Sequence, residues 1–110
     1  MVGPAVRRGD VFLVGLDPTL GKELRKSRPC VVVSPDELNR HLRTVIVAPM
    51  TTGGRAYPFR VGCRFKKKDG YVVLDQIRTV GVNRLVRKMG RLSPKALAAS
   101  LEILQEMFAD

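Results

Sequence analysis

An arginine followed by proline and a short β-branched run is the arrangement in this chain that best suits phosphate chemistry. Pro29 biases Arg28 toward an extended backbone, and the run 30–33 (Cys-Val-Val-Val) predicts a buried strand of about four to six residues. A guanidinium held where a rigid strand begins can donate two fixed hydrogen bonds to phosphate oxygens. One such donor lowers the barrier of a reaction that develops negative charge by roughly 3 kcal/mol. Arg28 is therefore a candidate phosphate-stabilising residue, although a solvated surface arginine would have the same sequence signature.

Few other residues suggest acid–base or nucleophilic catalysis. His41, the only histidine, lies in a basic, polar segment typical of surface residues, and no Ser-His-Asp or Cys-His set has a recognisable spacing. Asp75 ends a predicted strand and could act as a base, or it could pair with one of the many arginines. No Gly-Lys-Ser/Thr follows Gly53-Gly54, which excludes a nucleotide P-loop. Two cysteines and one histidine argue against a Cys/His metal site, so we expect no metal and no other cofactor.

The charge balance favours an anionic partner. The chain has 20 Lys and Arg against 10 Asp and Glu, a formal net charge of +10, which attracts nucleic acids, anionic membranes or acidic proteins. No apolar run approaches the roughly 18 to 20 residues that a membrane span needs, and no signal peptide is recognisable, so we expect a cytoplasmic protein. The basic residues that could follow a single-stranded RNA backbone, or simply form solvated turns, are Arg55, Arg60, Arg64, Lys66, Lys67 and Lys68.

The elements that would position these residues are mainly β-strands. The 110 residues predict a single domain, with residues 1–7 as a flexible lead-in. Short strands separated by turn signals every 8 to 15 residues or so favour a small barrel or rolled sheet. Pro49, near the end of the third strand, suggests an edge or a bulge there. We expect strands at residues 10–16, 30–33, 44–50, 57–61, 71–75 with a continuation to 80, and 89–92.

Two helices are expected between and after these strands. Ser34 is a predicted N-cap with Pro35 at the first helical position, and this short helix should end near Leu42. Ser93 and Pro94 repeat the same signal before a longer helix, which should pack across the open side of the sheet. Its apolar stripe, at spacings of four, three and four, is Leu97, Leu101, Leu104 and Phe108.

Several motifs, kept in order along the chain, resemble those of the MazF/PemK/Kid toxins of bacterial type II toxin–antitoxin systems. The resemblance covers roughly residues 7 to 108 and implies an SH3-like small β-barrel with a C-terminal α-helix, assembled as a homodimer. It also implies a metal-independent endoribonuclease that cuts single-stranded RNA at a short sequence, leaving 2′,3′-cyclic phosphate and 5′-hydroxyl ends. An acidic antitoxin is the implied partner. The motifs are Arg8-Gly9-Asp10-Val11, Asp17-Pro18-Thr19, Arg28-Pro29-Cys30-Val31-Val32-Val33-Ser34, Thr44-Val45-Ile46-Val47-Ala48-Pro49-Met50-Thr51, Asp75-Gln76-Ile77-Arg78-Thr79-Val80 and Gly90-Arg91-Leu92-Ser93.

The resemblance also assigns site residues. The family's active-site arginine falls on Arg28, its threonine on Thr51, and an aspartate used by some members on Asp75. Where some members have a histidine, this chain has Lys22 beside Glu23, and lysine is a poor proton shuttle at neutral pH unless its pKa is lowered. Arg28 would then stabilise the phosphate and could serve as general acid, with Thr51 as an orienting hydroxyl. The residues expected to contact RNA are Lys22, Glu23, Arg25, Lys26, Thr52, Arg55 and Arg78.

Two other functions fit the same sequence. A non-enzymatic toxin of this fold could inhibit DNA gyrase, in which case the C-terminal residues would matter most. A basic module could also bind RNA without cutting it. The combination of Arg28-Pro29 with Thr51 favours the ribonuclease. The RNA sequence that is cut depends on the geometry of the segments 20–27 and 51–57, which the sequence does not define.

Overall fold

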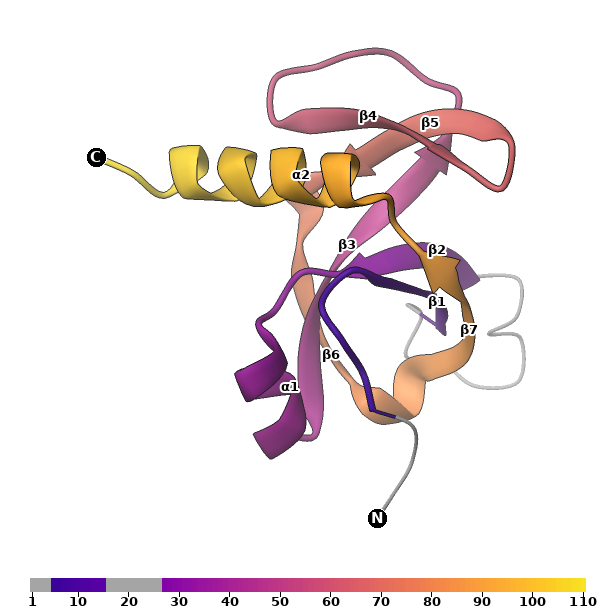
Figure 1. The fold of residues 1–110 in the computed structure, drawn as a ribbon, viewed down its shortest axis with the longest axis vertical. Coiled ribbons are helices and arrows are strands. Elements are labelled where there is room, and N and C mark those ends of the chain that lie inside the picture. Colours follow the sequence, from indigo (N-terminus) through magenta and orange to yellow (C-terminus); the bar gives the residue numbers. More distant parts are fainter. Residues whose placement is uncertain (1–4, 16–26) are drawn as a thin grey trace.

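One antiparallel sheet, with a long helix packed against it, makes up most of the fold (Figure 1). A computed structural model describes residues 5–15 and 27–110. The strands are β1 (Asp10–Gly15), β2 (Ser27–Val32), β3 (Thr44–Thr52), β4 (Arg60–Phe65), β5 (Lys68–Val73), β6 (Arg78–Gly81) and β7 (Leu85–Arg91). The helices are α1 (Asp36–His41) and α2 (Pro94–Met107), with short 3-10 helices η2 (Leu74–Gln76) and η3 (Val82–Arg84). The strand order is β4-β5-β3-β2-β1-β7, with β6 added beside β3.

The prediction of a mainly β fold with a C-terminal helix is confirmed. The sheet is rolled but stays open in the described residues, because β4 and β7 each pair with one neighbour only. The strand expected from 71 to 80 is interrupted by η2, after which β6 pairs with β3 instead of continuing β5. Strand β4 begins at Arg60, later than expected, because Phe59 has a left-handed backbone with φ of 65° that no strand residue adopts. Strand β7 begins earlier than expected, at Leu85.

Strand β3 is the centre of the fold because it changes neighbours along its length. Its residues 44–47 pair with β6, its residues 47–49 pair with β2, and its residues 50–52 pair with β5. The prediction that Pro49 marks an edge or a bulge is wrong, since Pro49 is buried inside the sheet opposite Cys30. It falls between the β6 and β5 ladders, and a residue without an N–H is tolerated where the ladder is interrupted.

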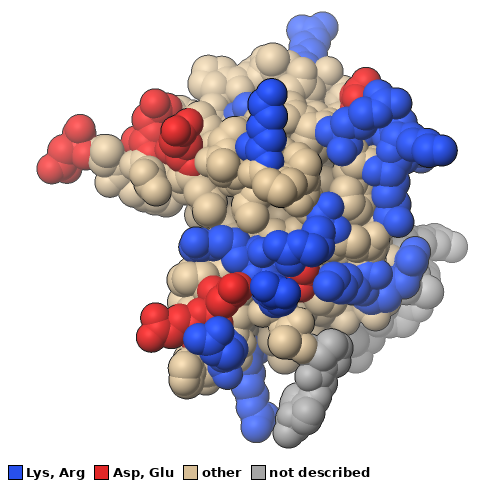
Figure 2. All heavy atoms as spheres, viewed as in Figure 1, with Lys and Arg blue, Asp and Glu red and all other residues tan. Residues whose placement is uncertain are grey.

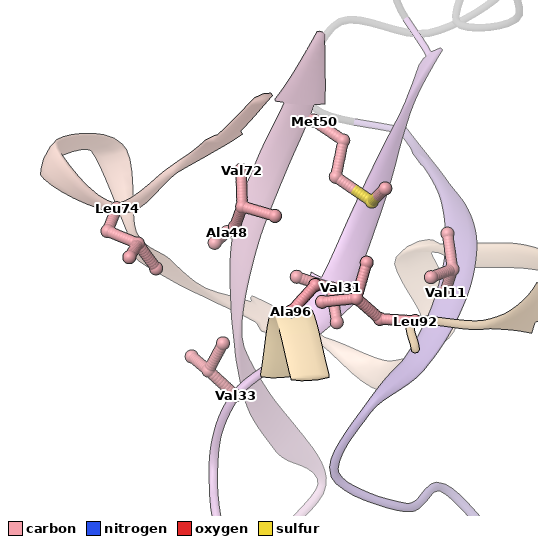
Figure 3. Packing of buried hydrophobic residues seen from close by; sticks show 9 residues of the cluster. All are labelled: Val11, Val31, Val33, Ala48, Met50, Val72, Leu74, Leu92 and Ala96. Carbon is pink, nitrogen blue, oxygen red and sulfur yellow. The ribbon is translucent and has the colours of Figure 1, made fainter. Parts of the chain in front are cut away.

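The two faces of the rolled sheet bury separate apolar cores. Because side chains along a strand alternate between faces, β2 sends Val31 to one core and Cys30 and Val32 to the other. This explains why the predicted run 30–33 is buried throughout. The first core, covered by α2, contains Val11, Val31, Val33, Ala48, Met50, Val72, Leu74, Leu92 and Ala96 (Figure 3). The second core, enclosed by the roll, contains Phe12, Val14, Cys30, Val32, Val45, Val47 and Val80.

Helix α2 begins as predicted. The Ser93 hydroxyl accepts a hydrogen bond from the Ala96 N–H at 3.2 Å, and a proline follows the cap. Leu97 and Leu104 pack against the first core, in agreement with the predicted stripe. Phe108, the last member of the stripe, is instead 72% exposed. Figure 1 shows the C-terminal end of α2 extending beyond the sheet, and Phe108 follows Met107, the last residue of the helix.

The prediction that Ser34 caps α1 is wrong. Pro35 occupies the N-cap position without a side-chain hydrogen bond, and the helix begins at Asp36. Ser34 is buried, so its hydroxyl must find partners inside the protein. It donates to Asn39 Oδ1 at 2.5 Å and accepts from the Ile46 N–H at 3.0 Å, which fastens α1 to β3.

Hydrogen bonds also fix the residues just before β1, part of which was expected to be a flexible lead-in. The Arg7 N–H donates to Asp10 Oδ2 at 2.9 Å. Asp10 is fully buried and forms ion pairs with Arg91 at 2.6 Å and Lys88 at 3.3 Å. Arg91 also donates to the Arg8 carbonyl at 3.0 Å. This buried carboxylate therefore joins β1, β7 and the N-terminal segment.

Candidate functional site

Strand register brings two predicted site residues to one face of the sheet. The register between β2 and β3, continued by two residues past its last pair, sets Arg28 opposite Thr51. Opposite residues of an antiparallel pair point to the same face, with Cβ atoms typically about 4.5–5.5 Å apart. Pro29 and Met50, which face each other in the same continuation, both line one pocket of about 280 Å³, and this agrees with the register.

A third predicted site residue, Arg78, lies on the same face. It stands opposite Val47 in the ladder between β3 and β6, and Val47 belongs to the second core together with Cys30. Burial raises the pKa of the Cys30 thiol to about 12, while the charges of Arg28 and Arg78 oppose that rise, so both guanidinium groups act on this one thiol. Both arginines are exposed, and no carboxylate in the described part of the chain pairs with either. Two positive groups are therefore available to an anion.

The Thr51 hydroxyl is oriented by its neighbours. It accepts a hydrogen bond from the Tyr71 N–H at 3.2 Å and donates to the Gly53 carbonyl at 3.3 Å. Gly53 and Gly54 have φ values of 70° and 97°, which are left-handed conformations that favour glycine, and they form a tight loop directly after β3. By giving up the long contact to Gly53, the hydroxyl could donate to a phosphate oxygen.

Asp75 lies in η2 and is engaged by an arginine. Nε and Nη2 of Arg60 donate to the two carboxylate oxygens at 3.2 and 3.4 Å. This contact lowers the pKa of Asp75, so the carboxylate is charged at neutral pH and binds a proton less readily than an ordinary aspartate. Arg60 also lies over the Tyr57 ring, with Cζ 4.9 Å from the ring centroid. The ion pair favours a role in holding Arg60, and the catalytic assignment of Asp75 stays a prediction.

The other predicted RNA contacts fall on exposed segments. Thr52 is the last residue of β3, and Arg55 lies in the loop that follows. Both residues are exposed. His41 is exposed at the end of α1, with Nδ1 2.8 Å from the Glu37 carbonyl oxygen, in agreement with a surface residue. Four predicted contacts lie outside the described residues, namely Lys22, Glu23, Arg25 and Lys26.

Comparison with known proteins decides the family. A family model described as PemK-like, MazF-like toxin of type II toxin-antitoxin system matches residues 7–108. The chain belongs to this family. Among curated relatives, endoribonuclease MazF of Staphylococcus epidermidis is 40% identical over 94 residues, covering 80% of this chain and 78% of the relative. Endoribonuclease toxin MazF of Escherichia coli strain K12 is 34% identical over 90 residues, covering 81% of each chain.

Solved structures agree with this assignment. An endoribonuclease from a mycobacterial species superimposes with a TM-score of 0.76 at 27% identity, covering 94% of this chain and 90% of that chain. A mycobacterial endoribonuclease in complex with its cognate antitoxin gives the same TM-score and identity, covering 91% of each chain. The resemblance stated from the sequence motifs is therefore confirmed, and it is a resemblance in fold as well.

Charge alone does not locate the functional face of this PemK/MazF-family toxin. Figure 2 shows Lys and Arg in a band across the view and over the β4–β5 hairpin, while acidic side chains gather at the end of α2 and near α1.

No cluster of three His, Cys, Asp or Glu side chains that could hold a metal ion occurs among the described residues. None of the helices in residues 5–15 and 27–110 has the length and apolar character needed to cross a membrane.

Sequence reasoning did not single out Tyr71, which it treated only as the start of a strand. The structure sets Tyr71 directly opposite Thr51 on β3 and opposite Gly62 on β4. No local motif carries this information, because it depends on how β3, β4 and β5 are aligned.

Proposed function

We propose that this toxin is an endoribonuclease that cuts single-stranded RNA, messenger RNA in particular, at a short sequence. The two MazF relatives, both named as endoribonucleases, support the activity. The observation that carries the proposal is the register that sets Arg28 opposite Thr51, with Arg78 on the same face and neither arginine paired with a carboxylate among the described residues. A phosphodiester bound here would meet two guanidinium groups and a hydroxyl.

The proposed reaction needs only the RNA itself and two proton transfers. The 2′-hydroxyl loses its proton, and its oxygen bonds to the adjacent phosphorus. The bond between phosphorus and the 5′ oxygen of the next nucleotide breaks, and that oxygen takes a proton. One product therefore ends in a 2′,3′-cyclic phosphate and the other begins with a 5′-hydroxyl. Negative charge builds on the two non-bridging oxygens as the new bond forms.

Each site residue has a role in that step. Arg28 donates charge-assisted hydrogen bonds to the non-bridging oxygens and could pass a proton to the departing 5′ oxygen. Thr51 orients the phosphate through its hydroxyl and is not ionised. Arg78 adds a second positive charge. Asp75 is charged and held by Arg60, so we assign it to positioning that arginine, whose guanidinium lies on the neighbouring β4.

We also propose that the protein forms a homodimer, acts in the cytoplasm and binds an acidic antitoxin. The mycobacterial neighbour solved with its cognate antitoxin supports an antitoxin partner. The net charge of +10 complements an acidic polypeptide that would cover the arginine-bearing face. The cytoplasm is where messenger RNA is translated, and a toxin that cuts it must act there.

Cleavage of a long single-stranded RNA in EDTA tests the activity and the site together. Arg28→Ala should lower the cleavage rate by about 10²- to 10³-fold, because one preorganised donor to the phosphoryl oxygens is lost. Arg40→Ala, which removes an exposed arginine from α1, is the matched control and should cut like wild type. Products should carry 2′,3′-cyclic phosphate ends. Equal cutting by wild type and Arg28→Ala would defeat the site assignment, and intact RNA beside trapped gyrase–DNA complexes would defeat the activity.

A further inference from the structure

The Tyr71 ring lies beside two glycines, on the face of the sheet that also carries Thr51. It faces Thr51 in one ladder and Gly62 in the other, so the three residues share a face of the sheet. A Cβ atom added at Gly62 would lie 3.7 Å from the Tyr71 ring, and one added at Gly54 would lie 3.8 Å from it. The ring therefore lies next to two residues that have no side chain, and neither of them shields it from a ligand.

An open pocket of about 350 Å³ adjoins this ring. Tyr71 is half-buried and is the only aromatic side chain among the described residues that line the pocket. Glycine at most of the other positions lets a ligand approach the backbone closely. A flat ligand fits such a space better than a branched one does. The lining residues are Gly53, Gly54, Gly62, Cys63, Asp69, Gly70 and Tyr71.

The charges on either side of the ring indicate which part of a nucleotide would bind. Along the β4–β5 hairpin, Arg64 pairs with Asp69 at 3.0 Å on one side of Tyr71, and Arg60 pairs with Asp75 at 3.2 Å on the other. Each of these two arginines is balanced by a carboxylate, and the exposed Lys66, Lys67 and Lys68 lie farther along, at the turn of the hairpin, so paired charges flank the ring itself. A phosphate gains little beside such paired charges and would bind Arg28 and Arg78 across β3, which no carboxylate of the described residues engages, whereas an uncharged nucleobase suits the ring.

We propose that Tyr71 is a stacking platform for one nucleobase of the RNA, at or next to the nucleotide whose phosphate is cut. The inference rests on the proposed ribonuclease function. Stacking on an aromatic ring strengthens binding of any base by roughly 5- to 150-fold. Because the Tyr71 N–H also holds the Thr51 hydroxyl at 3.2 Å, a base on this ring fixes the strand relative to Thr51. Tyr71 thus acts as a positioning residue that selects which phosphate reaches Arg28.

Binding of a short 2′-O-methyl oligoadenylate, which lacks the attacking hydroxyl, tests the proposal by fluorescence anisotropy. Tyr71→Leu should weaken binding by roughly 5- to 150-fold, and Tyr71→Phe, which keeps the ring, should bind like wild type. Phe108→Ala, an exposed aromatic at the end of α2, is the control and should have no effect. Unchanged binding by Tyr71→Leu overturns the platform and leaves the ribonuclease proposal standing. Absence of both binding and cleavage by wild type overturns the ribonuclease proposal itself.

Replacing one adenosine at a time by an abasic residue separates stacking from a structural role of Tyr71. Removing the base at one position should weaken binding by wild type, whereas removing the same base should leave the affinity of Tyr71→Leu unchanged. If the variant loses the same affinity as wild type when that base is removed, the platform is overturned.

A second measurement does not depend on the folding of Tyr71→Leu. The chain has no tryptophan and two tyrosines, so in Tyr57→Phe the tyrosine emission comes from Tyr71 alone. The emission should be quenched when the oligonucleotide binds, and unchanged emission would contradict the proposal.

Discussion

The region joining β1 to β7 and the exposed ends of β2 and β6 use arginine in opposite ways. Arg91 donates to the buried Asp10 at 2.6 Å and to the Arg8 carbonyl at 3.0 Å, so its hydrogen-bonding groups serve the protein itself. Arg28 and Arg78 are exposed, and no carboxylate in the described residues engages them. The same side chain stabilises the fold in one region and stays available to a ligand in the other. A nearby buried carboxylate makes the difference.

Two aspartates show a matching contrast. Asp10 is completely buried and has two cationic partners, whereas the Asp75 side chain is 42% exposed and has one. Removing the buried Asp10 carboxylate breaks charge-assisted hydrogen bonds that hold three segments together, while an exposed pair is largely replaced by contacts with water. Burial therefore predicts that the first aspartate determines stability and that the second has little effect on it.

Asp10→Ala is the largest test of this contrast. The substitution should lower the free energy of unfolding by about 1.5–3 kcal/mol, because the Arg7 N–H and the Arg91 guanidinium lose their charge-assisted hydrogen bonds to the carboxylate. Urea denaturation of the two proteins measures the difference. Asp75→Ala is the matched control and should cost less than about 1 kcal/mol. Similar losses from both substitutions would mean that burial does not separate the two sites.

Arginine-to-lysine substitution sharpens the comparison between Arg28, which no carboxylate of the described residues engages, and Arg91, which pairs with Asp10. Lysine keeps the positive charge but not the paired donors, so Arg28→Lys should lower the cleavage rate by roughly 10- to 150-fold, the equivalent of one charge-assisted hydrogen bond. Its free energy of unfolding should change by no more than about 0.5 kcal/mol. Arg91→Lys should show the reverse, with lower stability and near-normal cleavage by the folded protein. A stability loss in Arg28→Lys equal to that in Arg91→Lys would contradict the division of roles.

The smallest effect is the pH dependence contributed by Asp75. Arg60 lowers the pKa of this carboxyl below its ordinary value of 3.8, so the folded state favours the charged form. The stabilisation is therefore fully present above about pH 4 and is lost as the pH falls through the lowered pKa. Wild type should lose up to about 1 kcal/mol more than Asp75→Asn between pH 5 and pH 2 in urea denaturation. Parallel profiles for the two proteins would show that the ion pair does not contribute.

Local patterns predicted the elements that depend on local physics. The run 30–33 is buried because both faces of β2 meet a core, and the Ser93 cap forms because its partner lies three residues away. Ser34 has the same local signal and fails as a cap, because Asn39 and the β3 backbone compete for its hydroxyl. A distant partner of this kind leaves no trace in the neighbouring sequence.

The same distinction between local and distant partners applies to the candidate site. Arg28 could be identified from the sequence because proline and a β-branched run follow it directly. Its position opposite Thr51, the Arg60–Asp75 pair and the place of Tyr71 all depend on register between strands that are far apart in the chain. A shift of one residue in β3 would turn Thr51 to the other face, and nothing in the local sequence fixes that alignment.

The change of partners along β3 has a mechanical consequence. Among the described residues, the β4–β5 hairpin forms its ladder with the rest of the sheet at residues 50–52 of β3 only, and α2 contacts it through β4. A small tilt of the hairpin would therefore pivot about the stretch just beyond Pro49, moving the aromatic ring of Tyr71 while the guanidinium of Arg28 stays still. The distance between the Tyr71 ring and the Arg28 guanidinium thus depends on the rigidity of β3 at residues 50–52. That rigidity limits how precisely the site can select one phosphate of a bound RNA over the neighbouring one.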